Sequence, residues 1–254
     1  MAIYQKGGRN AMTKIFAHRG ASAYAPENTV EAFALAMEQG ADGIELDVQM
    51  TKDGQVVVIH DETIDRVSDG TGAVRDYTLE ELKKFHFSNH MENYENAAIP
   101  TLKEVLDLIK SSNMLLNIEL KTGIYWYPNL EEKTMELVKE AGMEDRVIYS
   151  SFNHYSIKKI LELDSHAECA FLYSDVILNV DKYAKNAGVC GLHPAVYHLK
   201  MAEFLKEYQE SGLKVRVWTV NKKEDMEKFI KADLEAVITN YPDKALEIRK
   251  SLQK

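Results

Sequence analysis

Cysteine is scarce in this sequence: its 254 residues include only 2, Cys169 and Cys190, each within an apolar run. Neither lies at metal-ligand spacing from another thiol, so we expect both to be buried core thiols and not a functional pair. Long apolar runs are also absent. No segment approaches the ~20 residues of a membrane span, and the first residues contain no stretch of signal-peptide length. We therefore expect a cytoplasmic protein without stable membrane insertion.

Positive charge is in short supply as well. Lysine and arginine number 31 against 40 aspartate and glutamate residues, which gives a net charge of −9. We do not expect so acidic a chain to bind nucleic acid or anionic membranes, and an anionic substrate would have to be bound by local basic groups. With 45% hydrophobic and 28% charged residues, the composition excludes a disordered chain, a collagen-like fibre and a membrane bundle.

Short apolar runs recur along the chain, and most are followed by a polar loop and then by a segment with helical periodicity. This alternation is typical of a parallel sheet, and the length fits one α/β barrel of about 250 residues. We expect residues 14–254 to form a single barrel domain and residues 1–13 to be an extension outside it. The predicted strands, one more than a barrel of eight needs, are 14–17, 43–48, 56–59, 114–120, 147–150, 168–172, 188–192, 215–220 and 236–239.

Helices are predicted between these strands, and two of them begin with capping residues. Asn28 with Glu31, and Thr101 with Glu104, have the spacing of a capping box. Gly40 is expected to end the first of these helices. The other helices are predicted near 78–85, 130–141, 155–163, 181–187, 201–210, 223–231 and 244–252.

The interval between the second and third predicted strands is too short for a crossover helix, so the barrel is predicted to lack a helix there. Residues 51–54 have good turn chemistry. The sequence leaves open whether these strands form a tight crossover or a hairpin; a hairpin would bring His60 beside Glu45 and Asp47. Residues 61–99 are predicted to be a short insertion that lies over the barrel mouth, where substrate contacts are made.

Ionisable residues gather at the downstream ends of the first four predicted strands. In a barrel these ends meet at one rim, so residues remote in sequence can surround one pocket. The residues concerned are His18, Arg19, Glu45, Asp47, His60, Asp61, Glu119 and Lys121.

Three of these residues have the chemistry of a metal site. Glu45 and Asp47 are two residues apart and share a strand face, and Glu119 can approach from another strand end. Carboxylates that converge without cysteine form a hard-oxygen site, which suits Mg²⁺ or Ca²⁺ better than zinc.

The remaining strand-end residues suggest acid–base chemistry on an anion. His18 and His60 have ordinary pKa values near ~6.5, so one can accept a proton while the other donates one. Arg19 offers a planar fork for phosphate oxygens, and Lys121 adds a point charge beside Glu119. The alternative is that these two cations only balance the carboxylates.

The ordered motifs resemble those of the glycerophosphodiester phosphodiesterases over nearly the whole chain. That resemblance implies a distorted TIM barrel that hydrolyses glycerophosphodiesters, which are deacylated phospholipids, to sn-glycerol 3-phosphate and an alcohol. The motifs are His18-Arg19-Gly20, Pro26-Glu27-Asn28-Thr29, Glu45-Leu46-Asp47-Val48, Thr51-Lys52-Asp53-Gly54, His60-Asp61, Ile99-Pro100-Thr101-Leu102, Asn117-Ile118-Glu119-Leu120-Lys121, Trp218-Thr219-Val220-Asn221 and Thr239-Asn240-Tyr241-Pro242-Asp243.

The resemblance also implies a role for each matched position. His18 and His60 would be the acid–base pair, and Arg19 and Lys121 would bind the phosphate. One divalent cation, Mg²⁺ or Ca²⁺, would be held by Glu45, Asp47 and Glu119. Trp218 resembles the family's aromatic residue near the glycerol end of the pocket, although a buried core tryptophan is an alternative. Glu27 lies in the matching loop and would support the site from behind, while Asn28 would only cap a helix.

Other functions are compatible with parts of this pattern. A related barrel phosphodiesterase could act on lysophospholipids, in the manner of a lysophospholipase D, with Tyr125-Trp126-Tyr127 as an apolar surface. A non-catalytic phosphodiester-binding barrel would be expected to lack a histidine or carboxylate that this chain retains. A metal amidohydrolase would show two strand-end histidines one residue apart. His86 and His90 are interpreted as exposed loop residues. The sequence leaves open the alcohol, the metal, the nucleophile, which histidine is the acid, and the oligomeric state.

Overall fold

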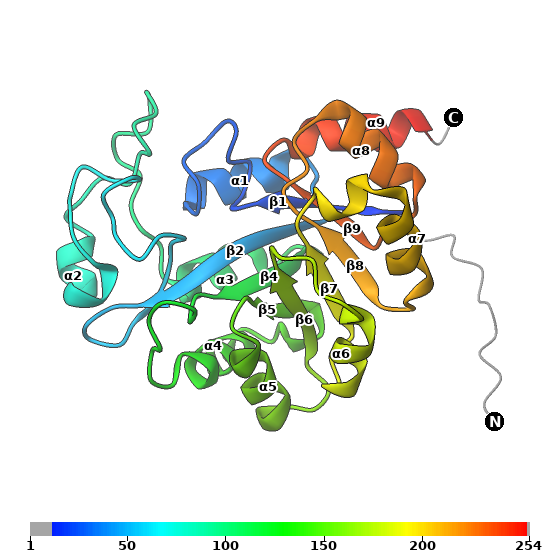
Figure 1. The fold of residues 1–254 in the computed structure, drawn as a ribbon. Coiled ribbons are helices and arrows are strands. Elements are labelled where there is room, and N and C mark those ends of the chain that lie inside the picture. Colours follow the sequence, from blue (N-terminus) through cyan, green and yellow to red (C-terminus); the bar gives the residue numbers. More distant parts are fainter. Residues whose placement is uncertain (1–11, 253–254) are drawn as a thin grey trace.

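Eight parallel strands form a closed barrel in the computed structural model, which describes residues 12–252 (Figure 1). Strand β1 pairs with both β9 and β2, which closes the sheet. The predicted extension at residues 1–13 lies outside the described residues except for Met12 and Thr13. The barrel strands are β1 (Lys14–His18), β2 (Gly43–Met50), β4 (Leu115–Leu120), β5 (Val147–Ser151), β6 (Glu168–Tyr173), β7 (Gly191–Pro194), β8 (Lys214–Val217) and β9 (Ala236–Thr239).

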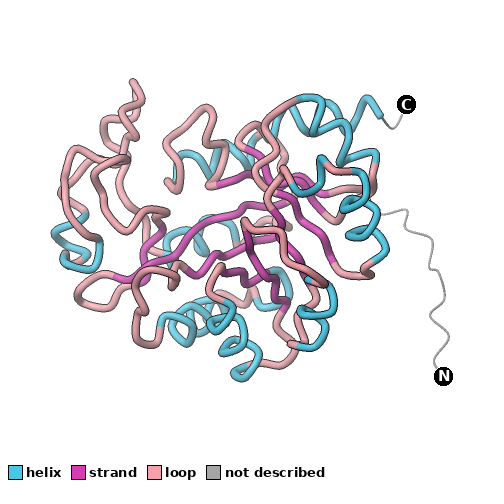
Figure 2. The backbone as a smooth tube through the Cα atoms, in the orientation of Figure 1, coloured by secondary structure: helices cyan, strands magenta, loops and turns pink. Residues whose placement is uncertain are grey.

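Helices surround the barrel on its outside (Figures 1 and 2). Helix α3 shows why they pack there: Leu102, Val105, Leu106 and Ile109 recur at helical spacing and are all buried. The barrel helices are α1 (Val30–Glu38), α3 (Leu102–Ile109), α4 (Leu130–Glu140), α5 (His154–Leu163), α6 (Val180–Asn186), α7 (Ala202–Glu210), α8 (Lys223–Lys231) and α9 (Pro242–Leu252). Shorter helical turns are η1 (Val74–Asp76), α2 (Leu79–Leu82), η2 (Glu144–Arg146) and η3 (His198–Lys200). None of the helices in residues 12–252 has the length and apolar character of a membrane span.

The ninth predicted strand, β3 (Val56–Val58), is not part of the barrel. It turns back and pairs antiparallel with the end of β2, so the alternative left open by the sequence resolves to a hairpin. Gly54 adopts φ +78° in the turn, a conformation that favours glycine. The predicted absence of a helix between β2 and β3 is confirmed. Because β3 lies outside the barrel, however, α3 takes the helix position between β2 and β4.

The insertion after β3 is a folded unit that shares an apolar core with β3. In Figure 1 it is the cyan segment that contains α2, beyond the end of β2. Thr78 and Glu81 form the capping box that begins α2, which has a single turn and is shorter than predicted. The insertion packs against β3 and Ile59, and the shared apolar core comprises Val57, Ile59, Ile64, Val67, Val74, Leu82, Phe87 and Ile99.

Packing inside the barrel explains why β2 contains a glycine, Gly43. Phe16, Ile148, Ala170, Ala236 and Ile238 form a separate buried cluster there. A Cβ atom on Gly43 would lie 2.6 Å from the ring of Phe16, so a larger residue at that position would force the ring or β2 to shift. This apolar cluster lies inside the barrel, and its member Ile238 also lines the pocket described below.

Several local predictions need correction. The N-cap of α1 is Thr29, not Asn28: the Thr29 hydroxyl accepts from the Ala32 N–H. Asn28 instead has φ +58° and is buried against the site. Strand β7 begins at Gly191, three residues later than predicted, because Gly188 still belongs to the turn that ends α6. In both cases the apolar run predicted the element, and a capping or turn residue set the position at which it begins.

The cysteine prediction is correct for one of the two thiols. Cys169 is buried, whereas Cys190 is only half-buried, and both are free. Cys190 lies just before β7, where its thiol donates to the Cys169 carbonyl at 3.5 Å. His86 and His90 are exposed, as predicted.

Candidate active site

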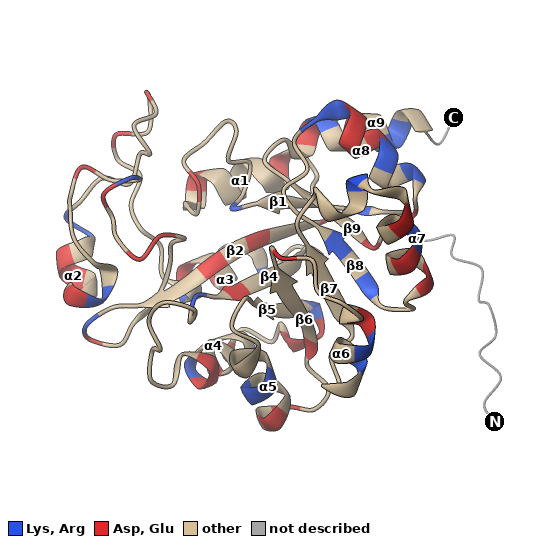
Figure 3. Cartoon of the chain, in the orientation of Figure 1, with Lys and Arg blue, Asp and Glu red and all other residues tan. Residues whose placement is uncertain are grey.

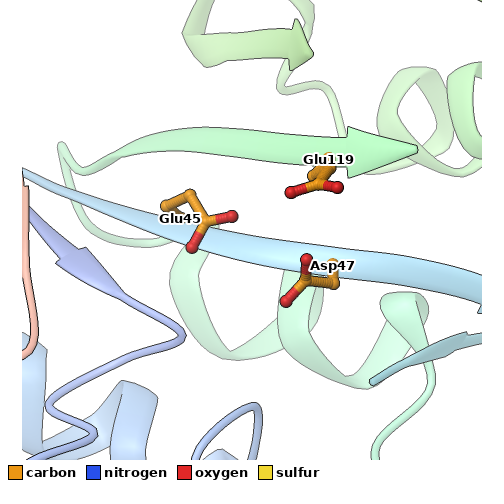
Figure 4. Close-up of side chains that lie close together, drawn as sticks. All are labelled: Glu45, Asp47 and Glu119. Atoms are coloured by element: carbon orange, nitrogen blue, oxygen red, sulfur yellow. The ribbon is translucent and has the colours of Figure 1, made fainter. Parts of the chain in front are cut away.

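Three carboxylates converge at the carboxyl ends of two neighbouring barrel strands. Glu45 and Asp47 lie on β2, and Glu119 on β4 is the register partner of Asp47. One oxygen of each lies within 4.8 Å of the others. All three residues are buried, with exposed fractions of 5%, 0% and 7%. Figure 4 shows the carboxylates turned toward one another, and Figure 3 shows acidic residues along β2. The predicted convergence is confirmed.

Burial and mutual repulsion give these carboxylates different proton affinities. Burial, followed by the charges of Asp47 and Glu119, raises the pKa of Glu45 well above its usual value. Burial likewise raises the pKa of Glu119 to about 7, against the opposing charge of Lys121. For Asp47 burial opposes ionisation, but nearby positive charge, that of Arg19 foremost, holds the pKa well below its usual range. The cluster is therefore short of positive charge when all three groups are ionised.

The residues present fit a divalent cation. The donor set consists of carboxylate oxygens alone, which Mg²⁺ and Ca²⁺ prefer. Asp47 Oδ1 is buried and has no hydrogen-bond partner among the described residues. A buried carboxylate oxygen normally has such a partner, so this atom is available to a ligand.

Two basic side chains contact the carboxylate cluster. Arg19 Nε lies 3.4 Å from Asp47 Oδ2, and Lys121 Nζ lies 3.1 Å from Glu119 Oε1. Glu27 accepts a hydrogen bond from Arg19 Nη1 at 2.9 Å and so orients the guanidinium from behind. Arg19 is also held through its backbone, which has φ +56° and donates to the Glu45 carbonyl.

The two histidines have different partners. His18 Nδ1 lies 2.7 Å from Asn240 Oδ1, so Nδ1 carries the proton and Nε2 faces Glu45 at 3.9 Å. Burial, followed by the charge of Arg19, lowers the pKa of His18 to about 4, so this side chain is neutral at pH 7. His60 Nδ1 instead lies 2.6 Å from the Asp61 carboxylate.

One pocket of about 160 Å³ brings both histidines together with Arg19, Glu45 and Glu119. Its apolar side includes Trp218, which follows β8 and is half-buried, so it is not a core tryptophan. The indole Nε1 donates to the His193 carbonyl at 2.7 Å, and the ring meets Phe152 edge to face. The pocket is lined by His18, Arg19, Glu45, His60, Asn117, Glu119, Phe152, Leu172, Trp218 and Ile238.

Sequence reasoning missed four polar residues of the site. Asn28 donates to Asp47 Oδ2 at 2.9 Å, and Asn240 orients His18. Asn117 is 1% exposed, and neither polar atom of its amide has a partner within residues 12–252. Its position two residues before Glu119, on the same strand face, was the available signal. Arg66, from the insertion, had no such signal, because its partners include a residue 39 positions away.

The fold and the site together define a TIM barrel whose charged pocket, suited to a metal ion, lies at the carboxyl ends of the strands. The sequence model of the "Glycerophosphoryl diester phosphodiesterase family" matches residues 18–244. The chain therefore belongs to this family of enzymes.

Individual relatives agree with this assignment. A protein of Caldanaerobacter subterraneus subsp. tengcongensis, named glycerophosphodiester phosphodiesterase, is 46% identical over 91% of this chain and 95% of its own. A protein of the same name from Bacillus altitudinis is 42% identical over 95% of this chain and 100% of its own. Among solved structures, an Oleispira antarctica phosphodiesterase in complex with the product sn-glycerol-3-phosphate has a TM-score of 0.86 at 29% identity, covering 94% of this chain and 97% of that one.

Proposed function

We propose that this protein hydrolyses glycerophosphodiesters to sn-glycerol 3-phosphate and an alcohol. The observation that carries the proposal is a pocket lined by two histidines, Arg19 and two carboxylates of the buried cluster, Glu45 and Glu119. The third carboxylate, Asp47, contacts Arg19, and Lys121 contacts Glu119. Support comes from the Oleispira antarctica relative, whose structure contains sn-glycerol-3-phosphate as the product. The small-molecule substrate is anionic, and the basic groups offset the negative charge of the protein at the site.

Glu45, Asp47 and Glu119 would hold one Mg²⁺ or Ca²⁺ ion. When bound, such an ion stabilises negative charge on the phosphoryl oxygens. Arg19 and Lys121 would bind the same oxygens, because each contacts a carboxylate of the cluster. Trp218 would pack its half-buried ring against the carbon atoms of the glycerol or of the alcohol.

His18 and His60 would transfer protons, and their partners favour opposite roles. His18 is neutral with Nε2 unprotonated, which suits a group that accepts the proton of the nucleophile. The Asp61 carboxylate lies 2.6 Å from His60 Nδ1 and so orients the imidazole, which suits a group that gives a proton to the departing alkoxide. The nucleophile is either water or the glycerol 2-hydroxyl, and the latter would form a cyclic phosphate that is then hydrolysed.

An assay of glycerol 3-phosphate release tests this proposal. We expect turnover of glycerophosphocholine or glycerophosphoethanolamine with Mg²⁺ or Ca²⁺, and its loss with a chelator. His18→Ala is expected to lower the rate at least ~100-fold, the lower end of acid–base contributions. Full activity of His18→Ala or of Glu45→Ala would contradict the site assignment. Oxygen-18 water, with a search for cyclic glycerol phosphate, distinguishes the two nucleophiles.

Lysophospholipids are a second candidate substrate, favoured by exposed apolar side chains after β4. Ile124 and Trp126 are 70% and 56% exposed, whereas Tyr127 is buried and bonds to Gln49. Exposed apolar groups near the mouth could contact an acyl chain. Turnover of lysophosphatidylcholine that equals or exceeds that of glycerophosphocholine at the same concentration would favour this candidate.

A further inference from the structure

Arg66 connects the insertion to the active site through two carboxylates. Its Nη1 and Nη2 donate to the two oxygens of Glu27 at 2.9 and 2.7 Å. Its Nε and Nη2 donate to the two oxygens of Asp61 at 2.6 and 3.1 Å. A single guanidinium therefore binds both carboxylates in bidentate fashion, a geometry that the planar fork of arginine allows and an ammonium group does not.

Each of these carboxylates also contacts a residue of the pocket. Asp61 lies 2.6 Å from His60 Nδ1, and Glu27 lies 2.9 Å from Arg19 Nη1. The side chains of His60 and Arg19 come from different parts of the chain, yet both are oriented through carboxylates that share Arg66. Movement of the Arg66 guanidinium would change the direction of both.

We propose that Arg66 is a positioning residue for the reaction: it fixes the imidazole of His60 relative to the guanidinium of Arg19. This inference rests on the proposed function of these two groups. The insertion, which contains Arg66 and α2, would then orient groups of the active site as well as cover the barrel mouth.

The ion pairs of Arg66 are poorly suited to a purely structural role. The Arg66 side chain is 45% exposed, and Glu27 keeps a second cation, Arg19, when the guanidinium of Arg66 is lost. The apolar core that the insertion shares with β3 includes Val67, next in sequence. Loss of the guanidinium should therefore leave the fold intact while it frees Asp61 and Glu27 to move.

The experiment compares Arg66→Met, Arg66→Lys and the control Arg75→Met. Arg75 lies in the same insertion and stacks on the Tyr125 ring, with its guanidinium 3.6 Å from the ring centroid. We expect Arg66→Met to lower kcat/KM about 10- to 100-fold, the range for loss of a group that supports direct ligands or shifts reacting groups by ~1 Å. Arg66→Lys should recover little of this, and Arg75→Met should stay within about twofold of the unaltered protein.

Two further measurements separate positioning from folding. Millimolar guanidinium should partly restore activity to Arg66→Met without changing its thermal midpoint. The added ion can bind between Glu27 and Asp61, in place of the guanidinium of the side chain. Arg66→Met combined with Asp61→Asn should cost little more than the worse single change, because both break one connection. If Arg66→Met does not fold, Arg66→Lys decides the question.

The outcomes are distinct from those that test the proposed function. If the unaltered protein releases no glycerol 3-phosphate, the proposed function fails, and the Arg66 variants are then compared on bis(p-nitrophenyl) phosphate. Activity within about twofold of the unaltered protein for Arg66→Met or Arg66→Lys would overturn the positioning role, and so would additive effects in the double variant.

Discussion

Glu119→Gln should make the metal-free protein more stable at alkaline pH, at the expense of its activity. Glu119 is 7% exposed, and its pKa of about 7 lies above its ordinary value of 4.5. Between these values the folded protein binds a proton that the unfolded chain has released, so stability falls as pH rises. At ~1.36 kcal/mol per pKa unit, the cost of ionised Glu119 is about 3 kcal/mol above pH 7.

The variant removes this cost but also the ion pair with Lys121, so a net gain of about 1 to 3 kcal/mol is expected at pH 8. Near pH 4.5, where folded Glu119 is protonated, the variant and the unaltered protein should differ little. Urea unfolding in the presence of a chelator, at pH 8 and at pH 5, measures both values. Added Ca²⁺ should then stabilise the unaltered protein more than the variant, because the variant has lost one of the proposed ligands.

Glu140→Gln, an exposed position on α4, is the matched control and should change stability by less than about 0.5 kcal/mol at either pH. Two results would refute the reasoning. One is a Glu119→Gln protein no more stable than the original at pH 8 in chelator. The other is an equal gain at pH 5, which would show that the effect does not come from ionised Glu119.

Three other predictions address the site and the barrel interior. Asn28→Gly keeps the φ of +58° but removes the hydrogen bond to Asp47, and should weaken Ca²⁺ binding about 10- to 100-fold by calorimetry; unchanged affinity would mean that Asn28 does not orient its partner. His193 is fully buried, and burial followed by the charge of Arg216 lowers its pKa well below 6.5. The free energy of unfolding should therefore fall by up to ~1.4 kcal/mol per pH unit below pH 6.5. His193→Gln should remove this pH dependence, as measured by urea unfolding at several pH values. Gly43→Ala should cost about 1 to 3 kcal/mol by overpacking against Phe16; a variant as stable as the original would contradict the close approach.

Much of the fold was predictable because its signals are local. Strand β9 has the predicted bounds, and the capping box of Thr101 and Glu104 begins α3 as expected. A capping residue lies within three positions of its partner, so the sequence contains the whole interaction. Pairing between strands is not local in this sense. The apolar run of β3 is compatible with either direction, and only its hydrogen bonds to β2 place it outside the barrel.

The site, like the fold, has features that local sequence signals predict and features that depend on contacts between distant segments. Glu45 and Asp47 share a strand face because their spacing matches the period of a strand, and the rim of a parallel barrel brings Glu119 to them. The sequence by itself therefore determined the acidic cluster and His18 at the end of β1, whereas His60 reaches the cluster only because β3 turns back along β2. Only the tertiary structure decided which groups orient them. Asn28 was interpreted as a cap and instead bonds to Asp47, and Arg66 joins two carboxylates far apart in the chain. Periodicity specifies the face on which a side chain lies, whereas its partner depends on how distant segments pack against one another.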